Sequence, residues 1–169
     1  MRNVVRVIDS ISEWAGKSVR WLGVILVVQV TYEVTMRYVF NSPSLWGYEL
    51  GIMLGATLFV LAFAYTHRQR AHIRVDVIYV HLPPRVKATI DVLGDLLVFS
   101  PLIILLAIKS WDWAWYAWST SEKMPTTGWY PPAAPLRTMV LLGFVLLALQ
   151  GVAELVRNLH LLIRNKTYD

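Results

Sequence analysis

Four long apolar segments constrain this chain more than any other feature. They cover about residues 19–38, 47–66, 88–108 and 136–156, and each is close to the roughly 20 residues that a helix needs to cross a bilayer. Because an open sheet would leave backbone groups without partners in lipid, the four spans must be helical. The sequence therefore predicts an all-α membrane protein, a single four-helix transmembrane domain over residues 1–169.

The composition favours lipid as the solvent. Only 16% of the residues are charged and the mean hydropathy is +0.49, whereas soluble domains average about 25% charged residues. The absence of Cys excludes disulfides and thiol chemistry. The sequence shows no set of nucleophile, base and orienting residue, no phosphate-binding glycine loop and no paired metal-ligand motif. We therefore expect neither an enzyme nor a bound cofactor or metal.

The distribution of Lys and Arg predicts the orientation. Most of the 16 basic residues lie in the N-terminal tail, in the connection between the second and third spans, or after the fourth span. By the positive-inside rule, both termini and this connection face the cytoplasm. The basic residues flank apolar runs and form no single patch, which argues against a nucleic-acid partner. The first span is followed by no signal-peptide cleavage site, so we expect it to remain as an anchor.

The middle connection contains the stretch "RAHIRVDVIYVHLPPR", residues 70–85. Its alternating apolar and polar residues predict a turn and a short interfacial helix at the cytoplasmic headgroups. Pro84 can occupy an early position of the third helix. The four histidines, which a membrane haem protein would need as axial ligands, all lie toward this face outside the apolar runs. A haem or metal site there is the alternative to solvated or capping histidines, which are His67, His72, His81 and His160.

Charged residues inside the spans are candidates for function because they are costly in lipid. In the first span Gln29, Glu33 and Arg37 recur every four residues and share one helix face. Glu33 ahead of Arg37 is the favourable order for an ion pair. One interpretation is an ion or proton relay. The other is a self-neutralised pair near the outer interface, or a pair that docks on a partner subunit.

Two further polar pairs have the same spacing. Asp91 and Asp95 lie at the predicted start of the third span, where acids stabilise a helix N-terminus; a cation site is the alternative, but it would need further oxygen ligands. Gln150 and Glu154 lie at the inner end of the fourth span, with Arg157 as a partner for Glu154. We expect these pairs to stabilise helix ends and helix contacts.

Gly47, Gly51 and Gly55 also recur every four residues, on the second span and next to Glu49. Small residues at this spacing let another helix approach closely in lipid, although glycine is also common in membrane helices without such a role. The pattern predicts a helix contact along this strip.

The connection between the third and fourth spans is rich in Trp. Trp111, Trp113, Trp115 and Trp118 predict an aromatic belt that continues the third helix toward the periplasm or cell exterior. Prolines and a glycine then predict a stiff turn into the fourth span. Membrane anchoring explains the tryptophans, and a docking surface for an external protein is the alternative.

Together these motifs resemble the small membrane subunit of tripartite ATP-independent periplasmic (TRAP) transporters, the DctQ type. The resemblance covers nearly the whole chain. It is carried by the end of the first span at Glu33, Arg37 and Tyr38, by the entry to the second at Trp46 and Glu49, and by "AHIRVDVIYVHLP" and "TGWYPPAAPLR".

The resemblance implies a protein of the bacterial inner membrane without catalysis of its own. A large permease subunit would hold the substrate and sodium sites, and a periplasmic binding protein would deliver an organic acid. This chain would be the membrane scaffold that packs beside the permease and helps to dock the binding protein. Gly47, Gly51 and Gly55 would contact the large subunit, and Glu33, Arg37, Glu49, Glu154 and Arg157 would form the intramembrane polar pairs.

The resemblance also assigns roles outside the spans. His72 and Asp76 match the family's H-I-x-V-D pattern and would form a cytoplasmic clasp between the second and third helices. Trp46, Trp129 and Tyr130 would face the periplasmic binding protein. Two other functional classes remain open for the sequence: a haem- or quinone-linked membrane anchor of an electron-transfer complex, and a self-assembling channel. The channel is disfavoured because no span carries a polar stripe along its full length.

Overall fold

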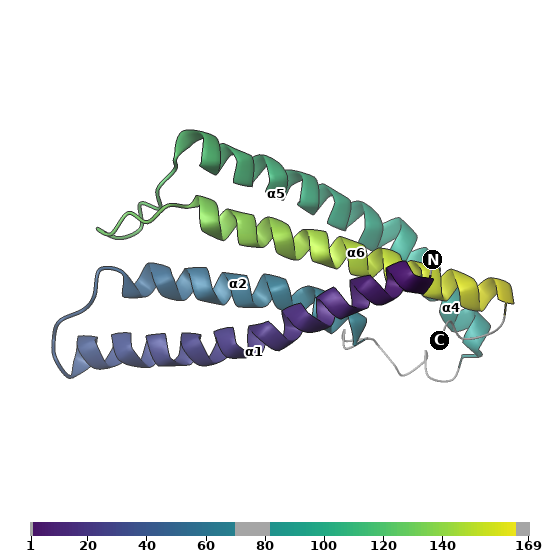
Figure 1. The fold of residues 1–169 in the computed structure, drawn as a ribbon, viewed down its shortest axis with the longest axis horizontal. Helices are drawn as coiled ribbons and strands as arrows, with labels where there is room; N and C mark the ends of the chain where they lie inside the picture. Colours follow the sequence, from purple (N-terminus) through teal and green to yellow (C-terminus); the bar gives the residue numbers. More distant parts are fainter. Residues whose placement is uncertain (1, 70–81, 165–169) are drawn as a thin grey trace.

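The computed structural model describes residues 2–69 and 82–164, which form long helices lying side by side (Figure 1). His72, Asp76 and His81, and with them the predicted interfacial helix and clasp, lie outside the described residues. The elements in chain order are α1 (Arg2–Tyr38), α2 (Gly47–Arg68), α4 (Pro84–Gly94), the π-helical segment η1 (Asp95–Phe99), α5 (Ser100–Thr120) and α6 (Ala134–Arg164).

Four stretches are long and apolar enough to cross a membrane: Val5–Tyr38, Gly47–Arg68, Thr89–Thr120 and Ala134–His160. The described residues contain no strand, and their one isolated bridge joins Lys123 to Pro132. The predicted all-helical class with four spanning helices is confirmed, and the chain is a multi-pass membrane protein. Each helix runs past its predicted span on at least one side. The largest extension is in α1, which begins at Arg2 and is 37 residues long, or about 55 Å at the usual rise per residue.

The helices form an open row in the order α1, α2, α6 and α5 (Figure 1). Contacts join α1 to α2, α2 to α6 and α6 to α5, and the first half of α1 also reaches α6. The beginning of α1 and the end of α6 lie at the same end of the row. We call this the terminal end (2–20, 62–69, 84–95 and 150–164) and the opposite one the loop end (33–49 and 113–138).

The third spanning helix is interrupted by one π-helical turn. Pro83 is extended, with ψ 152°, and α4 begins at Pro84, which confirms Pro84 as an early helix position. Asp91 is therefore about two turns inside the helix, and Asp95 lies in η1. The prediction that these two acids stabilise the helix N-terminus was wrong, because the helix begins before the apolar run and the dipole acts only within the first turn.

Glycines set the close contacts between helices. A Cβ on Gly143 of α6 would collide with the Val60 side chain of α2 and lie 2.9 Å from the Val60 carbonyl group. At the terminal end, a Cβ on Gly16 would enter the Tyr65 ring and one on Gly151 would enter the Phe99 ring. In lipid, such small residues allow backbones to approach and gain dispersion energy. These three glycines fix the α2–α6, α1–α2 and η1–α6 contacts.

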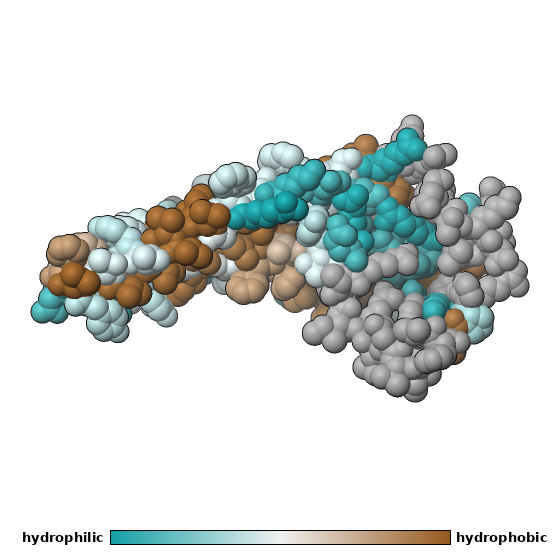
Figure 2. Space-filling view, turned by 90° about the horizontal axis from the view of Figure 1, so that it is seen from below, coloured by the Kyte–Doolittle hydropathy of each residue, from teal (hydrophilic) through white to brown (hydrophobic). Residues whose placement is uncertain are grey.

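Apolar side chains cover most of the outer surface. Phe59 of α2, Leu97 of η1 and Val27 of α1 are each about two-thirds exposed. Figure 2 shows hydrophilic residues gathered over the N-terminal half of α1, and hydrophobic residues along much of the rest of that face. This division indicates that the spanning part faces lipid or other membrane helices, whereas the first turns of α1 have a polar surface.

Candidate functional site

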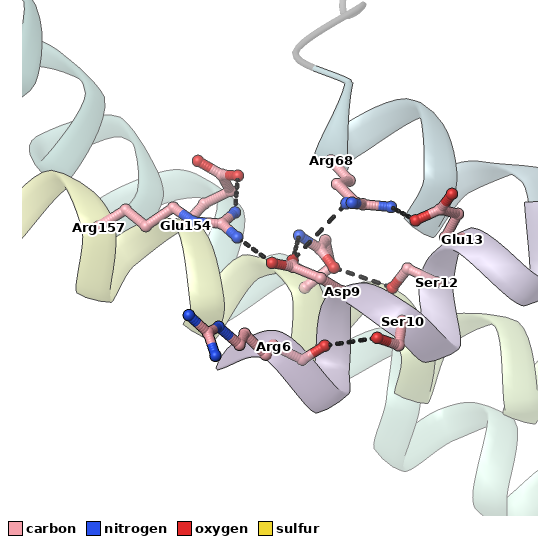
Figure 3. A network of polar contacts seen from close by, with 9 residues as sticks. Arg6, Asp9, Ser10, Ser12, Glu13, Arg68, Glu154 and Arg157 are labelled. Atoms are coloured by element: carbon pink, nitrogen blue, oxygen red, sulfur yellow. Dashed lines mark hydrogen bonds and ion pairs between the residues drawn. The ribbon is translucent and has the colours of Figure 1, made fainter. Parts of the chain in front are cut away.

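Polar residues from α1, α2 and α6 form a cluster at the terminal end (Figure 3). Asp9 of α1 lies at its centre. The Arg157 guanidinium donates to Asp9 Oδ2, and Gln150 Nε2 donates to Asp9 Oδ1 over 3.2 Å. Arg68 Nε of α2 lies 3.8 Å from Asp9 Oδ1. One carboxylate of α1 is therefore shared by α2 and α6.

The floor of this cluster is fully buried. Gln150 has no exposed surface, and Ser12 donates a 2.8 Å hydrogen bond to Gln150 Oε1. Ser12 is 1% exposed. Because a buried amide is costly unless both its donor and its acceptor are bonded, these bonds fix the approach of α1 to α6.

Two further ion pairs complete the cluster. Arg157 Nη1 lies 2.5 Å from Glu154 Oε1 within α6. Arg68 Nη1 lies 2.9 Å from Glu13 Oε2, and Lys17 reaches the other oxygen of Glu13 over 2.9 Å. These ion pairs and those of Asp9 join three carboxylates to three basic groups. The geometry of the cluster suits a clamp between helices better than a binding site for an external ion.

The sequence analysis identified Gln150, Glu154 and Arg157 but missed their partners. Asp9 and Glu13 were not considered because the first helix was expected to begin near residue 19. Asp9, Glu13 and Lys17 follow one another at intervals of four residues, and the spacing of Glu13 to Lys17 is the helical ion-pair signal. That signal could have extended the predicted helix toward the N-terminus.

At the loop end, α1 is tied to the start of α2. Arg37 Nη2 donates to Glu33 Oε1 over 3.1 Å, and the Ser44 hydroxyl donates to the other oxygen of Glu33. The Gly47 amide donates to Ser44 Oγ over 3.1 Å. One turn deeper, Gln29 Nε2 donates to the Gly47 carbonyl over 2.7 Å. The pattern Gln29, Glu33, Arg37 thus forms one polar face, with its first two side chains bonded toward residues 44–47.

The glycines of the predicted strip have different surroundings. A Cβ on Gly47 would collide with the Glu33 carboxylate, and one on Gly51 would lie 3.2 Å from Gln29 Oε1. Both glycines therefore accommodate polar side chains of α1. A Cβ on Gly55 would meet no atom of the described residues within 4 Å. Of the three, only Gly55 has open space beside it.

Glu49 lies on the opposite side of α2 and is fully buried. Its Oε1 accepts a 2.8 Å hydrogen bond from the Thr127 amide, in the connection between α5 and α6. Within the part of the chain that the structure describes, no hydrogen bond or ion pair joins Glu49 to the Glu33–Arg37 pair. Glu49 instead links the first turn of α2 to a connection almost 80 residues later in the chain.

Arg137, a basic residue that the sequence analysis did not select, holds the same connection from the α6 side. Arg137 of α6 is 8% exposed and forms an ion pair with Glu122. Its Nη1 donates to the Trp113 carbonyl over 3.3 Å, and its guanidinium lies 4.4 Å from the centre of the Trp113 ring. Charged and aromatic contacts of this kind favour Arg over Lys.

The predicted aromatic surface lies at the loop end. The helix continues through the tryptophans to Thr120, and Trp111, Trp115 and Trp118 are each about 60% exposed. Trp46 stacks on Tyr32 of α1, with ring centroids 5.6 Å apart. Trp129 and Tyr130 are half exposed. The three candidate docking residues thus belong to two connections at one end of the molecule.

The structure gives no support for a metal centre within residues 2–69 and 82–164, where no group of three potential metal-binding side chains occurs. His67 stacks on Phe99, with ring centroids 4.6 Å apart and planes 3° apart. This contact places His67 in the packing of α2 against η1.

The sequence was compared with models of known protein families. A family model described as "Tripartite ATP-independent periplasmic transporters, DctQ component" matches residues 26–161. The match includes the Glu33–Arg37 pair, all of α2 and both connections at the loop end. A search of curated proteins found no match.

Proposed function

Because this chain belongs to the DctQ component family of tripartite ATP-independent periplasmic transporters, we propose that it is the scaffold on which such a transporter is assembled. The family consists of small membrane subunits that work with other transporter components and are not enzymes. We further propose which parts of this chain contact the partner subunits.

A rigid row of helices supports the scaffold role. The observation that carries it is the ion-pair cluster around Asp9, in which Arg68 and Arg157 join three helices. Breaking a partly buried charge pair leaves a charge without its partner, so the three helices resist sliding past one another. A subunit that stays fixed while its partner moves substrate needs this property.

We assign the substrate and sodium sites to the large permease subunit. The transported molecule is an organic acid, taken up by symport with sodium. We assign this subunit to the bacterial inner membrane with both termini in the cytoplasm, as the positive-inside rule predicts. The loop end then faces the periplasm, where Trp46, Trp129 and Tyr130 would contact the binding protein. Their partial exposure supports this assignment.

The remaining site residues are assigned to assembly. Gly55 contacts a helix of the large subunit, and His72 with Asp76 forms the cytoplasmic clasp. The Glu33–Arg37 and Glu154–Arg157 pairs neutralise charges within this chain and keep them compatible with a membrane environment, which the ion pairs at 3.1 and 2.5 Å support.

The test is purification of this chain from native membranes in mild detergent, followed by mass-spectrometric identification of partners present in equal amounts. We expect a large permease with many spans, with or without a periplasmic binding protein. A haemoprotein or a soluble dehydrogenase as the stoichiometric partner would reject the scaffold proposal in favour of an electron-transfer anchor.

A further inference from the structure

A groove of about 410 Å³ runs between α1 and α2 toward the loop end. Its volume lies in the range of sites that hold small molecules. Its walls are mostly apolar and include Val30, Val34 and Ile52. At its outer end lie Arg37, Tyr38 and Tyr48. The wall deeper in the groove is apolar apart from Gln29 and Glu33.

The order of these groups follows the membrane. Arg37 lies one residue before the end of α1, whereas Val30 lies seven residues deeper in the span, a rise of about 10 Å. Polar groups are thus at the level where a spanning helix ends, and apolar groups at the level of the hydrocarbon. An amphiphile with its head toward the loop end matches this order.

Arg37 can bind the head of such a molecule. Its side chain is 49% exposed, and in the described residues Nη2 donates to Glu33. A guanidinium has five donors in a planar fork that suits phosphate oxygens, so further donors are available. Tyr38 and Tyr48 are 79% and 54% exposed, and their amphipathic rings suit the membrane interface.

Glu33 adds little accessible negative charge to this end of the groove. Its carboxylate is bonded to Arg37 and Ser44, and its side chain is only 10% exposed. The accessible charge at the outer end is therefore that of Arg37. Gln29 lines the deep end, but it is 8% exposed and its amide is turned to the Gly47 carbonyl. The valines remain available to an acyl chain.

From these observations we propose that the α1–α2 groove binds one phospholipid. Its phosphate accepts hydrogen bonds from Arg37, and one acyl chain lies along Val30, Val34 and Ile52. The bound lipid covers the seam between the two helices at the loop end. This inference does not depend on the transporter assignment, because it uses only groups of this chain.

The experiment measures the phospholipid retained per chain after extensive washing in mild detergent, by mass spectrometry of the intact chain. Val34→Trp fills the apolar part of the groove without changing a charge, and Arg37→Gln removes the phosphate donor. We expect the unaltered chain to retain one phospholipid and each variant to retain it about tenfold less tightly, as loss of a charge-assisted bond or of acyl-chain contact predicts.

Val27→Trp is the matched control, because Val27 is 65% exposed on α1 and does not line the groove. It should retain the lipid as the unaltered chain does. Equal retention by all four proteins, or none by any, would mean annular lipid only and would overturn the proposal. Circular dichroism of each variant checks that the helices are intact, so that a loss of lipid is read only from folded protein.

The identity of the occupant has its own test. The chain contains no Cys, so Val34→Cys provides a single position for a photoactivatable crosslinker in native membranes. A crosslink to phospholipid supports the proposal. A crosslink to another polypeptide at this position would overturn it, since a partner helix would then fill the groove.

Discussion

At the terminal end, ion pairs join the side chains of three helices, whereas at the loop end the side chains of the helices hold the backbone of the connections. Arg157 and Arg68 both reach Asp9 across helix boundaries. In contrast, Glu49 accepts from the Thr127 amide, and Arg137 donates to the Trp113 carbonyl. The contacts at the terminal end fix the helices relative to one another. The contacts at the loop end fix the backbone conformation of the connection between α5 and α6.

The difference follows from what each end must satisfy. At the terminal end the helices continue past their apolar parts, so charged side chains on adjacent helices can meet directly. At the loop end the chain leaves the helices, and backbone groups of the connections need partners. Carboxylates and guanidinium groups supply those partners in strong, charge-assisted bonds.

The largest effect is expected from a substitution between the two ends, where α6 packs against α2. It tests whether this close helix contact holds the two ends together. Gly143→Leu should destabilise the chain by about 3 kcal/mol, because the new side chain would meet the Val60 backbone and force α6 away from α2. Thermal unfolding in detergent, followed by the fluorescence of the tryptophans, measures the change.

Gly55→Leu is the control for this variant, because a side chain at Gly55 enters open space. It should leave the isolated chain unchanged within about 0.5 kcal/mol but reduce co-purification with a large subunit. Equal stability of the two variants would refute the close α2–α6 contact. Unaltered co-purification of Gly55→Leu would refute the assignment of Gly55 to the subunit contact.

The next effect tests the clamp at the terminal end. Arg157→Leu removes the common partner of Asp9 and Glu154 and should cost about 2 kcal/mol, less than for a fully buried pair because Arg157 is 23% exposed. The thermal midpoint in detergent is the readout. Lys17→Ala removes an exposed partner of Glu13, for which we expect little change. If the two variants lowered the thermal midpoint equally, the ion pairs of Arg157 would stabilise the fold no more than the exposed Glu13–Lys17 pair, and the clamp would be refuted.

A smaller, local effect is expected at the loop end. Glu49→Ala removes the acceptor of the Thr127 amide and should cost about 1–2 kcal/mol. Hydrogen exchange of residues 121–133 should accelerate, while exchange in the first half of α1 stays the same. Glu49→Gln retains an acceptor oxygen and should preserve most of the protection. Faster exchange throughout the chain after Glu49→Ala would remove the distinction between the two ends.

The smallest effect concerns the pair between buried Glu33 and half-exposed Arg37. Arg37→Ala should lower the yield of the complex with a large subunit, because Glu33 then lacks its basic partner in the membrane. Changing Glu33 to Gln in the same chain should restore part of that yield. Matching yields for the single and double variants would show that the Glu33–Arg37 ion pair has no role in assembly.

Much of the fold followed from the sequence, because a bilayer admits few structures. The lengths of the apolar runs and the requirement to satisfy the backbone in lipid predicted four helices. The helix ends were less predictable. Hydropathy marks where a helix enters lipid and not where it begins, so residues 2–18 of α1 extended beyond the predicted span.

The polar sites were predicted only within single helices. Gln29, Glu33 and Arg37 share a face by spacing alone, and Glu154 lies three residues from Arg157. Contacts such as Asp9 with Arg157 or Glu49 with Thr127 depend on the order of helices in the row. The sequence does not state which helices are neighbours. The same limit explains why the strip from Gly47 was selected, whereas Gly143, which has no glycine four residues away, was not.

The order of helices in the row has a consequence for how the chain is made. Helices α1 and α2 are consecutive and pack together, as are α5 and α6, so each pair can assemble as soon as its second helix is in the membrane. The contact between the pairs depends on α6, which follows the other three spanning helices in the described part of the chain. Until then Val60 of α2 lacks its neighbour Gly143, and Glu49 lacks the Thr127 amide of the connection that precedes α6. Among the described helices, the α2–α6 seam therefore forms only after α6 is made, and this makes it the place to divide the molecule into two co-expressed halves.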